Sequence, residues 1–226
     1  MPRPFSLEYR VSDDPVALSH AAAQHFVHCA RAAVESRGKA RLALSGGSTP
    51  KATFQLLADK TQPYRAMMPW EKLEIYWVDE RCLPPDHPDS NYHMTRENLL
   101  DHVPIPPRQI HRMQGELDPE EAAAKYESEL RNQFRLEGAQ GPVFDMLALG
   151  MGDDGHTASL VPHTEAGSGD VSLRALTEKF THNGLKAVVV LRGKSLILQM
   201  YKRALAEVIE RKVNFGAAYI SGKNHR

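Results

Sequence analysis

One segment joins an apolar run to a loop rich in glycine and aspartate that ends in a histidine: LALGMGDDGHTASL, residues 147–160. The run reads as a buried strand, and catalytic side chains of α/β proteins often lie just past such strands. A neutral imidazole can accept a proton from water near physiological pH, and Asp153 or Asp154 is close enough in sequence to orient the ring of His156. We therefore predict proton-transfer chemistry at His156. The alternative is a structural role, because the chain has 11 histidines.

A second segment, LSGGSTPK at residues 44–51, has the composition of a phosphate-binding turn. A strand leads into two glycines and two hydroxyl residues, and a proline lies where a helix would start. Backbone N–H groups, the helix dipole and hydroxyl groups together favour a phosphate. The alternative is that these residues only cap the helix. The candidate binding residues are Ser45, Gly46, Gly47, Ser48 and Thr49.

A third segment, WVDER at residues 77–81, also lies at a strand end. The guanidinium of Arg81 can bind a phosphate as a fork of donors, while Asp79 and Glu80 hold it or contact sugar hydroxyls. The alternative is an ion-pair cluster on the surface, which contributes little to stability.

Two further patterns resemble nucleotide-binding motifs. Gly150, Gly152 and Gly155 match G-x-G-x-x-G, but Pro162 follows too soon for the long helix that a dinucleotide site requires. Gly193-Lys194-Ser195 resembles the end of a phosphate loop, but Val188 occupies the position of the first glycine. The sequence has no G-x-S-x-G, H-E-x-x-H or C-x-x-C motif, so the usual markers of nucleophile-elbow, zincin and thioredoxin-type chemistry are absent.

The elements that must position these loops alternate between strand and helix. Apolar residues at helical spacing follow Asp13-Asp14-Pro15 and predict a long helix that ends near Gly38. Further helices are expected at about 50–59, at 92–100 and from Asp118-Pro119 onward. Strands are expected at 5–11, 41–44, 73–78, 144–149 and 187–191. This order predicts an α/β fold: a doubly wound, mostly parallel sheet with helices on both faces, formed by residues 1–226 as a single domain.

The composition is that of an ordinary globular protein. Lys+Arg and Asp+Glu balance at 28 each, so no basic excess indicates nucleic-acid binding. The first 14 residues have no continuous apolar stretch, so we expect neither a signal peptide nor a membrane partner, and we expect a cytoplasmic protein. Cys29 and Cys82 are far apart and have no metal-type spacing, so we expect no metal site, and both are expected to be reduced rather than joined in a disulfide. The oligomeric state stays open.

Taken together, these segments resemble the 6-phosphogluconolactonase family. The strings LALSGGSTP, WVDER with DSNY after it, and LALGMGDDGHTASLVPHT look like its three signature segments, in the family's order. The resemblance runs from the first helix to about Thr177. It implies a doubly wound α/β fold and hydrolysis of 6-phospho-D-glucono-1,5-lactone, a step of the oxidative pentose phosphate pathway, with no metal or organic cofactor.

The resemblance also implies roles for individual residues. His156 would be the general base; Asp154, close to it in sequence, is the carboxylate that we expect to orient its ring. Residues 45–50 and Arg81 would hold the phosphate, and Asp79 with Asn91 would lie near the sugar.

Two further phosphate contacts are suggested less directly by the resemblance. Arg174 matches an arginine that precedes the family's TLT string. Lys194 lies two positions early for the family's G-x-x-K lysine, so whether it takes over that contact is left open.

Two alternatives remain beside a lactonase. Glucosamine-6-phosphate deaminases share the fold and the D-G-H string, but they continue with an AFNEP-like segment where this chain has TASLVPHT. A non-catalytic sugar-phosphate-binding module would keep the phosphate loop without doing chemistry. Ammonia release would indicate the first alternative, and binding without turnover would indicate the second.

Overall fold

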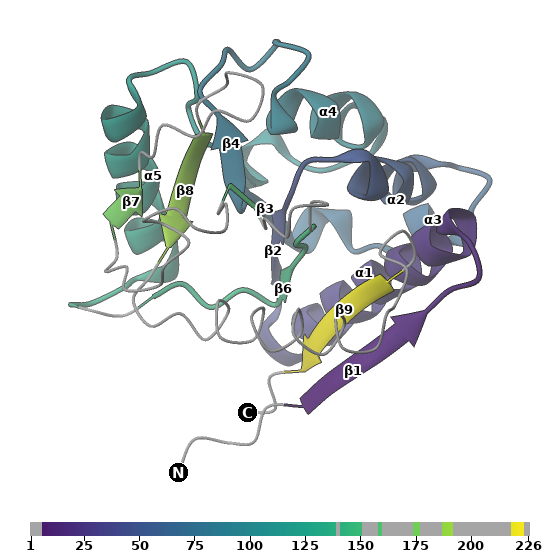
Figure 1. The fold of residues 1–226 in the computed structure, drawn as a ribbon. Coiled ribbons are helices and arrows are strands. Elements are labelled where there is room, and N and C mark those ends of the chain that lie inside the picture. Colours follow the sequence, from purple (N-terminus) through teal and green to yellow (C-terminus); the bar gives the residue numbers. More distant parts are fainter. Residues whose placement is uncertain are drawn as a thin grey trace.

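The centre of the fold is a four-stranded parallel sheet (Figure 1). The computed structural model describes residues 6–138, 141–150, 158–159, 174–176, 187–191 and 218–223. The sheet has the strand order β5-β3-β2-β6. Its strands are β2 (Ala40–Leu44), β3 (Leu73–Trp77), β5 (Ile110–His111) and β6 (Met146–Leu147). All three pairings within it are parallel, which confirms the predicted parallel sheet.

Helices cover both faces of this sheet, as predicted. The α-helices in the described residues are α1 (Pro15–Arg37), α2 (Ser48–Ala58), α3 (Pro63–Met67), α4 (Asn91–Asn98) and α5 (Pro119–Phe134). Short 3-10 turns lie at Trp70–Lys72, Leu100–His102 and Pro107–Gln109. Because side chains alternate along a strand, Leu42 and Leu44 of β2 pack in one core cluster with α1 and α2, whereas Ala43 packs in a second cluster with α5.

The helix ends follow from capping residues that are visible in the sequence. The Asp14 side chain accepts a hydrogen bond from the Ala17 N–H at 2.7 Å and starts α1. Gly38 ends the same helix in the left-handed region, with φ 77°. At the start of α5, Asp118 accepts from the N–H groups of Glu120 and Glu121. The predicted starts of α1 and α5 and the predicted end of α1 are therefore confirmed.

Two smaller antiparallel sheets accompany the parallel one. Strand β8 (Ala187–Leu191) lies between β4 (Asp79–Arg81) and β7 (Arg174–Leu176), and β1 (Ser6–Val11) pairs with β9 (Ala218–Lys223). The expectation that 187–191 belongs with the parallel strands is therefore wrong. An apolar run reports burial but not direction, and here the partner is the short strand β4, which directly follows β3.

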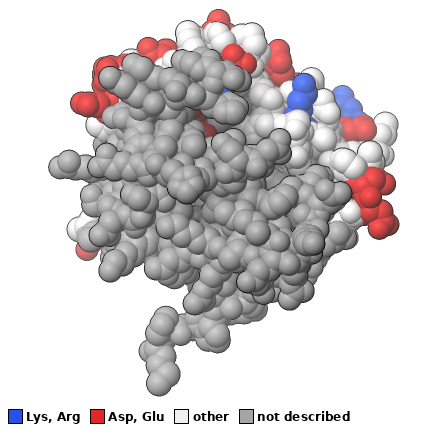
Figure 2. Space-filling view, in the orientation of Figure 1, with Lys and Arg blue, Asp and Glu red and all other residues white. Residues whose placement is uncertain are grey.

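Acidic and basic side chains both appear on the described part of the face in Figure 2, with acidic ones at its upper left, along its top and at its right edge. In the described residues, no helix has both the length and the apolar character that crossing a lipid bilayer requires.

Candidate active site

The ends of the central parallel strands bring the predicted loops to one edge of the sheet. Leu44 of β2 lies beside Trp77 of β3, and Ala43 lies beside Leu147 of β6. The pairing continues past the strands, because the Val78 N–H donates to the Leu44 carbonyl at 2.9 Å and the Ala148 N–H to the Ala43 carbonyl at 2.8 Å. The segments that follow these strands therefore start next to one another, which is where α/β folds bind ligands.

The loop after β2 leaves the start of α2 open. Gly47 is the N-cap residue, with φ 108°, and no side chain caps this helix. Ser48 and Thr49 form its exposed first turn. Gly47 thus occupies the cap position without a capping side chain, which leaves both interpretations of this segment in place: a helix cap, and an anion site at the N-terminal N–H groups of α2.

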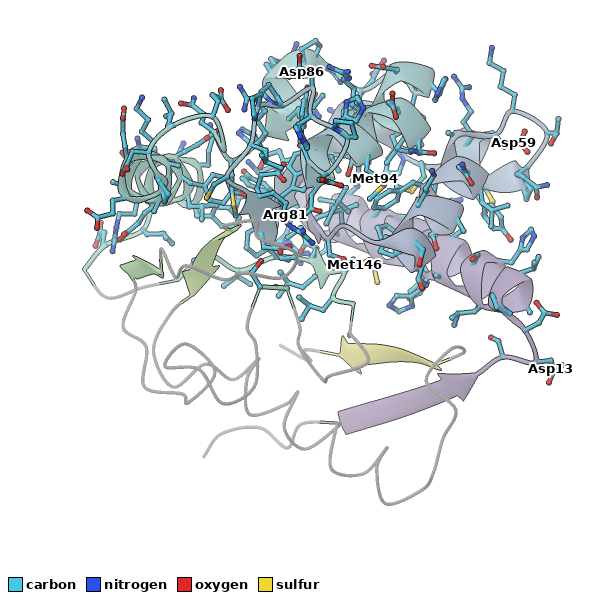
Figure 3. All side chains as sticks on the ribbon, turned by 45° about the horizontal axis from the view of Figure 1, so that its top comes forward. Asp13, Asp59, Arg81, Asp86, Met94 and Met146 are labelled. Carbon is cyan, nitrogen blue, oxygen red and sulfur yellow. The ribbon has the colours of Figure 1, made fainter. Side chains whose placement is uncertain are left out.

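The segment predicted as a loop after β3 is itself a strand, β4, whose side chains alternate between two faces. Successive side chains of a strand point to opposite faces, so Asp79 and Arg81 share one face and Glu80 takes the other. Asp79 is 4% exposed and Glu80 is 2% exposed, so the alternative of an ion-pair cluster on the surface is wrong. In Figure 3, Arg81 lies in the middle of the described side chains, between the labels of Met94 in α4 and Met146 in β6.

The buried Glu80 carboxylate joins β4 to the start of α4. Its Oε1 accepts from the N–H groups of Arg81 and Asn91, both at 2.7 Å. Its Oε2 accepts from the Tyr92 N–H at 2.8 Å and the Ser90 hydroxyl at 3.0 Å. Burial raises the pKa of Glu80, and these four hydrogen bonds oppose that rise. Glu80 therefore holds the backbone of Arg81 and of Asn91 at once.

Asp79 and Asn91 together connect the three loops. The Asn91 amide donates to the Asp79 carbonyl at 3.1 Å and to its Oδ1 at 3.3 Å. The Ser159 hydroxyl, from the segment after β6, donates to Asp79 Oδ2 at 2.5 Å. From the loop after β2, Gly46 lies so close to Asn91 that an added Cβ would be 1.9 Å from its Oδ1. The predicted neighbours Gly46, Asp79 and Asn91 are thus brought together.

Two buried polar atoms in the described part of the chain have no hydrogen-bond partner, and both belong to predicted phosphate-binding residues. They are Ser45 Oγ and Arg81 Nε. A buried donor without a partner is costly, so such atoms mark places where a ligand completes the hydrogen bonding. A guanidinium and a hydroxyl suit an anion with several oxygens.

Other predicted residues are not tested by the structure. His156, Asp154 and Lys194 lie outside the described residues. Arg174 is the first residue of β7, in the same sheet as β4, and only its backbone is described.

Sequence reasoning missed the roles of Glu80, Ser90 and Ser159. Ser90 could have been found, because a serine before a helical segment is a typical N-cap residue. Glu80 and Ser159 carry no local signal. Three of the four hydrogen-bond partners of Glu80 lie 10 to 12 residues away along the chain, and the partner of Ser159 lies 80 residues away.

Comparison with known proteins places this geometry in a family. Residues 13–208 match the family model described as glucosamine-6-phosphate isomerases/6-phosphogluconolactonase. The chain is similar to the 6-phosphogluconolactonase of Synechocystis sp., with 49% identity over 135 residues that cover 59% of this chain and 54% of the relative. A probable 6-phosphogluconolactonase of Arabidopsis thaliana is 34% identical over 165 residues, 70% of this chain and 60% of the relative. The chain thus spans about half the length of the first of these relatives.

Solved structures agree in fold. A 6-phosphogluconolactonase from Trypanosoma cruzi superposes with a TM-score of 0.65 at 28% identity, covering 80% of this chain and 73% of that one. The enzyme of that name from Thermotoga maritima gives a TM-score of 0.65 at 25% identity, covering 88% of each chain.

Proposed function

Because the chain belongs to the glucosamine-6-phosphate isomerase/6-phosphogluconolactonase family, we propose that it hydrolyses 6-phospho-D-glucono-1,5-lactone to 6-phospho-D-gluconate. The observation that carries this proposal is that two buried atoms without partners, Ser45 Oγ and Arg81 Nε, belong to residues predicted to bind phosphate. The start of α2, which no side chain caps, follows Ser45 by three residues. These groups supply an anion-binding end for the substrate. The carboxylate of Asp79 and the amide of Asn91 supply a polar wall for its hydroxyl groups.

The chemical step is assigned to His156. Its neutral imidazole takes a proton from water as the water attacks the lactone carbonyl, and Asp154 orients the ring. The proton then passes to the ring oxygen when the tetrahedral intermediate collapses. Ser159, three residues further along the chain, is hydrogen-bonded to Asp79, which supports the assignment of this segment to the site.

Binding of the phosphate at a distance from the reacting carbon provides orientation. A substrate held at one end places its carbonyl in a fixed position, which lowers the entropy cost of reaching the transition state. Lys194 and Arg174 are proposed as further phosphate contacts. No metal or organic cofactor takes part in the proposed reaction.

The test is turnover of the lactone. Glucose-6-phosphate dehydrogenase produces the lactone in situ, and acid formation is followed with and without this protein. We expect clear acceleration by the wild type, and we expect His156→Ala to lower kcat by about 10²–10⁴-fold with a smaller effect on KM.

Three other outcomes of this test would contradict the proposal. A His156→Ala variant with near-normal turnover would refute the assigned base. Ammonia release from glucosamine 6-phosphate would indicate a deaminase, and binding of 6-phosphogluconate without acceleration would indicate a binding module.

A further inference from the structure

The Asp79 carboxylate is held between donors from two different segments. Asn91 reaches one oxygen, Oδ1, at 3.3 Å, and Ser159 reaches the other, Oδ2, at 2.5 Å. The terminal torsion of an aspartate is broad, so its hydrogen-bond partners decide which way the carboxylate plane faces. Of these two contacts the one from Ser159 is much shorter, and short hydroxyl-to-carboxylate hydrogen bonds are the stronger ones.

The backbone just before Ser159 is unusual. Ala158 has φ 49°, in the left-handed region that non-glycine residues rarely adopt. Such a conformation costs free energy and persists where the surroundings hold it, which is typical of functional segments. Ser159 itself is 7% exposed, so its hydroxyl is directed at Asp79 from within the protein.

From these observations we propose that Ser159 is a positioning residue: its hydroxyl fixes the Asp79 carboxylate in the orientation that receives the sugar hydroxyls of the substrate. The inference rests on the proposed function, since it takes Asp79 as a group that contacts the sugar. Arg81 lies on the same face of β4 as Asp79, and its guanidinium group binds the phosphate end of the substrate. Loss of the Ser159 hydroxyl should therefore weaken contacts to the sugar and leave the phosphate contacts in place.

A matched pair of variants isolates the hydroxyl. Ser159→Thr and Ser159→Val add nearly the same volume and differ in whether a hydroxyl is present, so any cost of the extra bulk is shared by both. The probes are 6-phosphogluconate, which has both ends, and inorganic phosphate, which has only the anionic end. Binding is measured by calorimetry, and the melting temperature of each variant is recorded.

We expect Ser159→Val to bind 6-phosphogluconate about tenfold more weakly than Ser159→Thr, the size of one hydrogen bond to a charged group. Affinity for inorganic phosphate should agree between the two within about twofold. In an Asp79→Ala background the difference between the Thr and Val variants should vanish, because the hydroxyl acts only through that carboxylate.

A control serine is available in α1. Ser19 is 5% exposed and its hydroxyl donates to the Pro15 carbonyl at 2.8 Å. Ser19 lines a cavity together with Ser48 and Thr49 at the start of α2. Any effect of Ser19→Ala on binding should therefore be equal for the two probes, in contrast to the selective loss expected of Ser159→Val.

Three results would overturn the inference: equal affinities of the Thr and Val variants for 6-phosphogluconate, a parallel loss of phosphate binding, or a difference that persists without Asp79. The proposed function is judged separately, by lactone turnover of the wild type. A wild type that binds 6-phosphogluconate but does not accelerate hydrolysis fails the proposed function and still allows the Ser159 comparison. A wild type that binds neither probe overturns both.

Discussion

A single methyl group added at Gly46 should disturb the candidate site, because it would overlap the Asn91 side chain. An alanine Cβ there would lie 1.9 Å from Asn91 Oδ1 and 2.6 Å from its Cγ, whereas ordinary van der Waals contact begins at 3.4 Å. One of the two groups must therefore move by about 1.5 Å. Asn91 is 6% exposed and its amide is hydrogen-bonded to Asp79, so the movement breaks those contacts.

The expected cost of Gly46→Ala combines two effects. Overpacking in a close-packed interior costs about 1–3 kcal/mol, and the lost hydrogen bonds to Asp79 add about 1–2 kcal/mol. A total of about 3 kcal/mol lowers the melting temperature by about 6–12 °C in a chain of this size. Thermal unfolding followed by circular dichroism measures it.

A second substitution tests the cause of that loss. Asn91→Ala should lower the melting temperature of the wild type but raise that of Gly46→Ala, because it removes the atoms that the new methyl group meets. Gly150→Ala is the control, since a Cβ at that position meets nothing within 4 Å. The steric reasoning is refuted if Gly46→Ala melts within about 2 °C of the wild type, or if Asn91→Ala lowers both melting temperatures equally.

Two further predictions concern charge. Burial alone would raise the pKa of Glu74, but hydrogen bonds and charge interactions with Lys39 and Arg41 outweigh it and lower that pKa. Because the folded pKa lies below the unfolded one, the stabilisation is present near neutral pH and is lost as pH falls through the folded pKa. Glu74→Gln should thus cost about 1–3 kcal/mol of unfolding free energy at pH 7 and little near pH 3, and a gap that stays constant across this range contradicts the assignment. Arg81→Lys keeps the charge but loses the planar fork, so affinity for 6-phosphogluconate should fall about tenfold with little change in melting temperature; unchanged affinity would exclude Arg81 from the phosphate site.

Local signals predicted the elements whose causes are local. Asp14 and Gly38 mark the ends of α1 because capping depends on residues within a few positions. Strands β2 and β3 were visible as short apolar runs with turn residues after them. The three-residue strand β4 was not, because its pairing partner β8 lies more than 100 residues further along the chain.

In the candidate site, too, features with local causes could be predicted and features that depend on distant partners could not. Glycine-rich and acidic loops at strand ends could be recognised from residue types, and the structure joins Gly46, Asp79 and Asn91 as expected. The burial of Glu80 could not be predicted, since a charged residue is usually exposed and its compensating donors come mostly from the start of α4. The roles of His156, Asp154, Arg174 and Lys194 stay predictions, as does the single domain.

Side chains alternate between the two faces of β4, and this alternation limits which insertions and deletions the chain can accept. Inserting or deleting one residue just before Asp79 would exchange the two faces of the strand. Glu80 would then direct its negative charge toward the phosphate of the substrate. Arg81 would instead point toward the start of α4, where the Glu80 carboxylate is bound in the wild type. Length changes in the turn before α4 leave that parity untouched. Descendants of this sequence should therefore tolerate longer or shorter turns between Arg81 and Ser90, while the spacing from Trp77 to Arg81 stays constant.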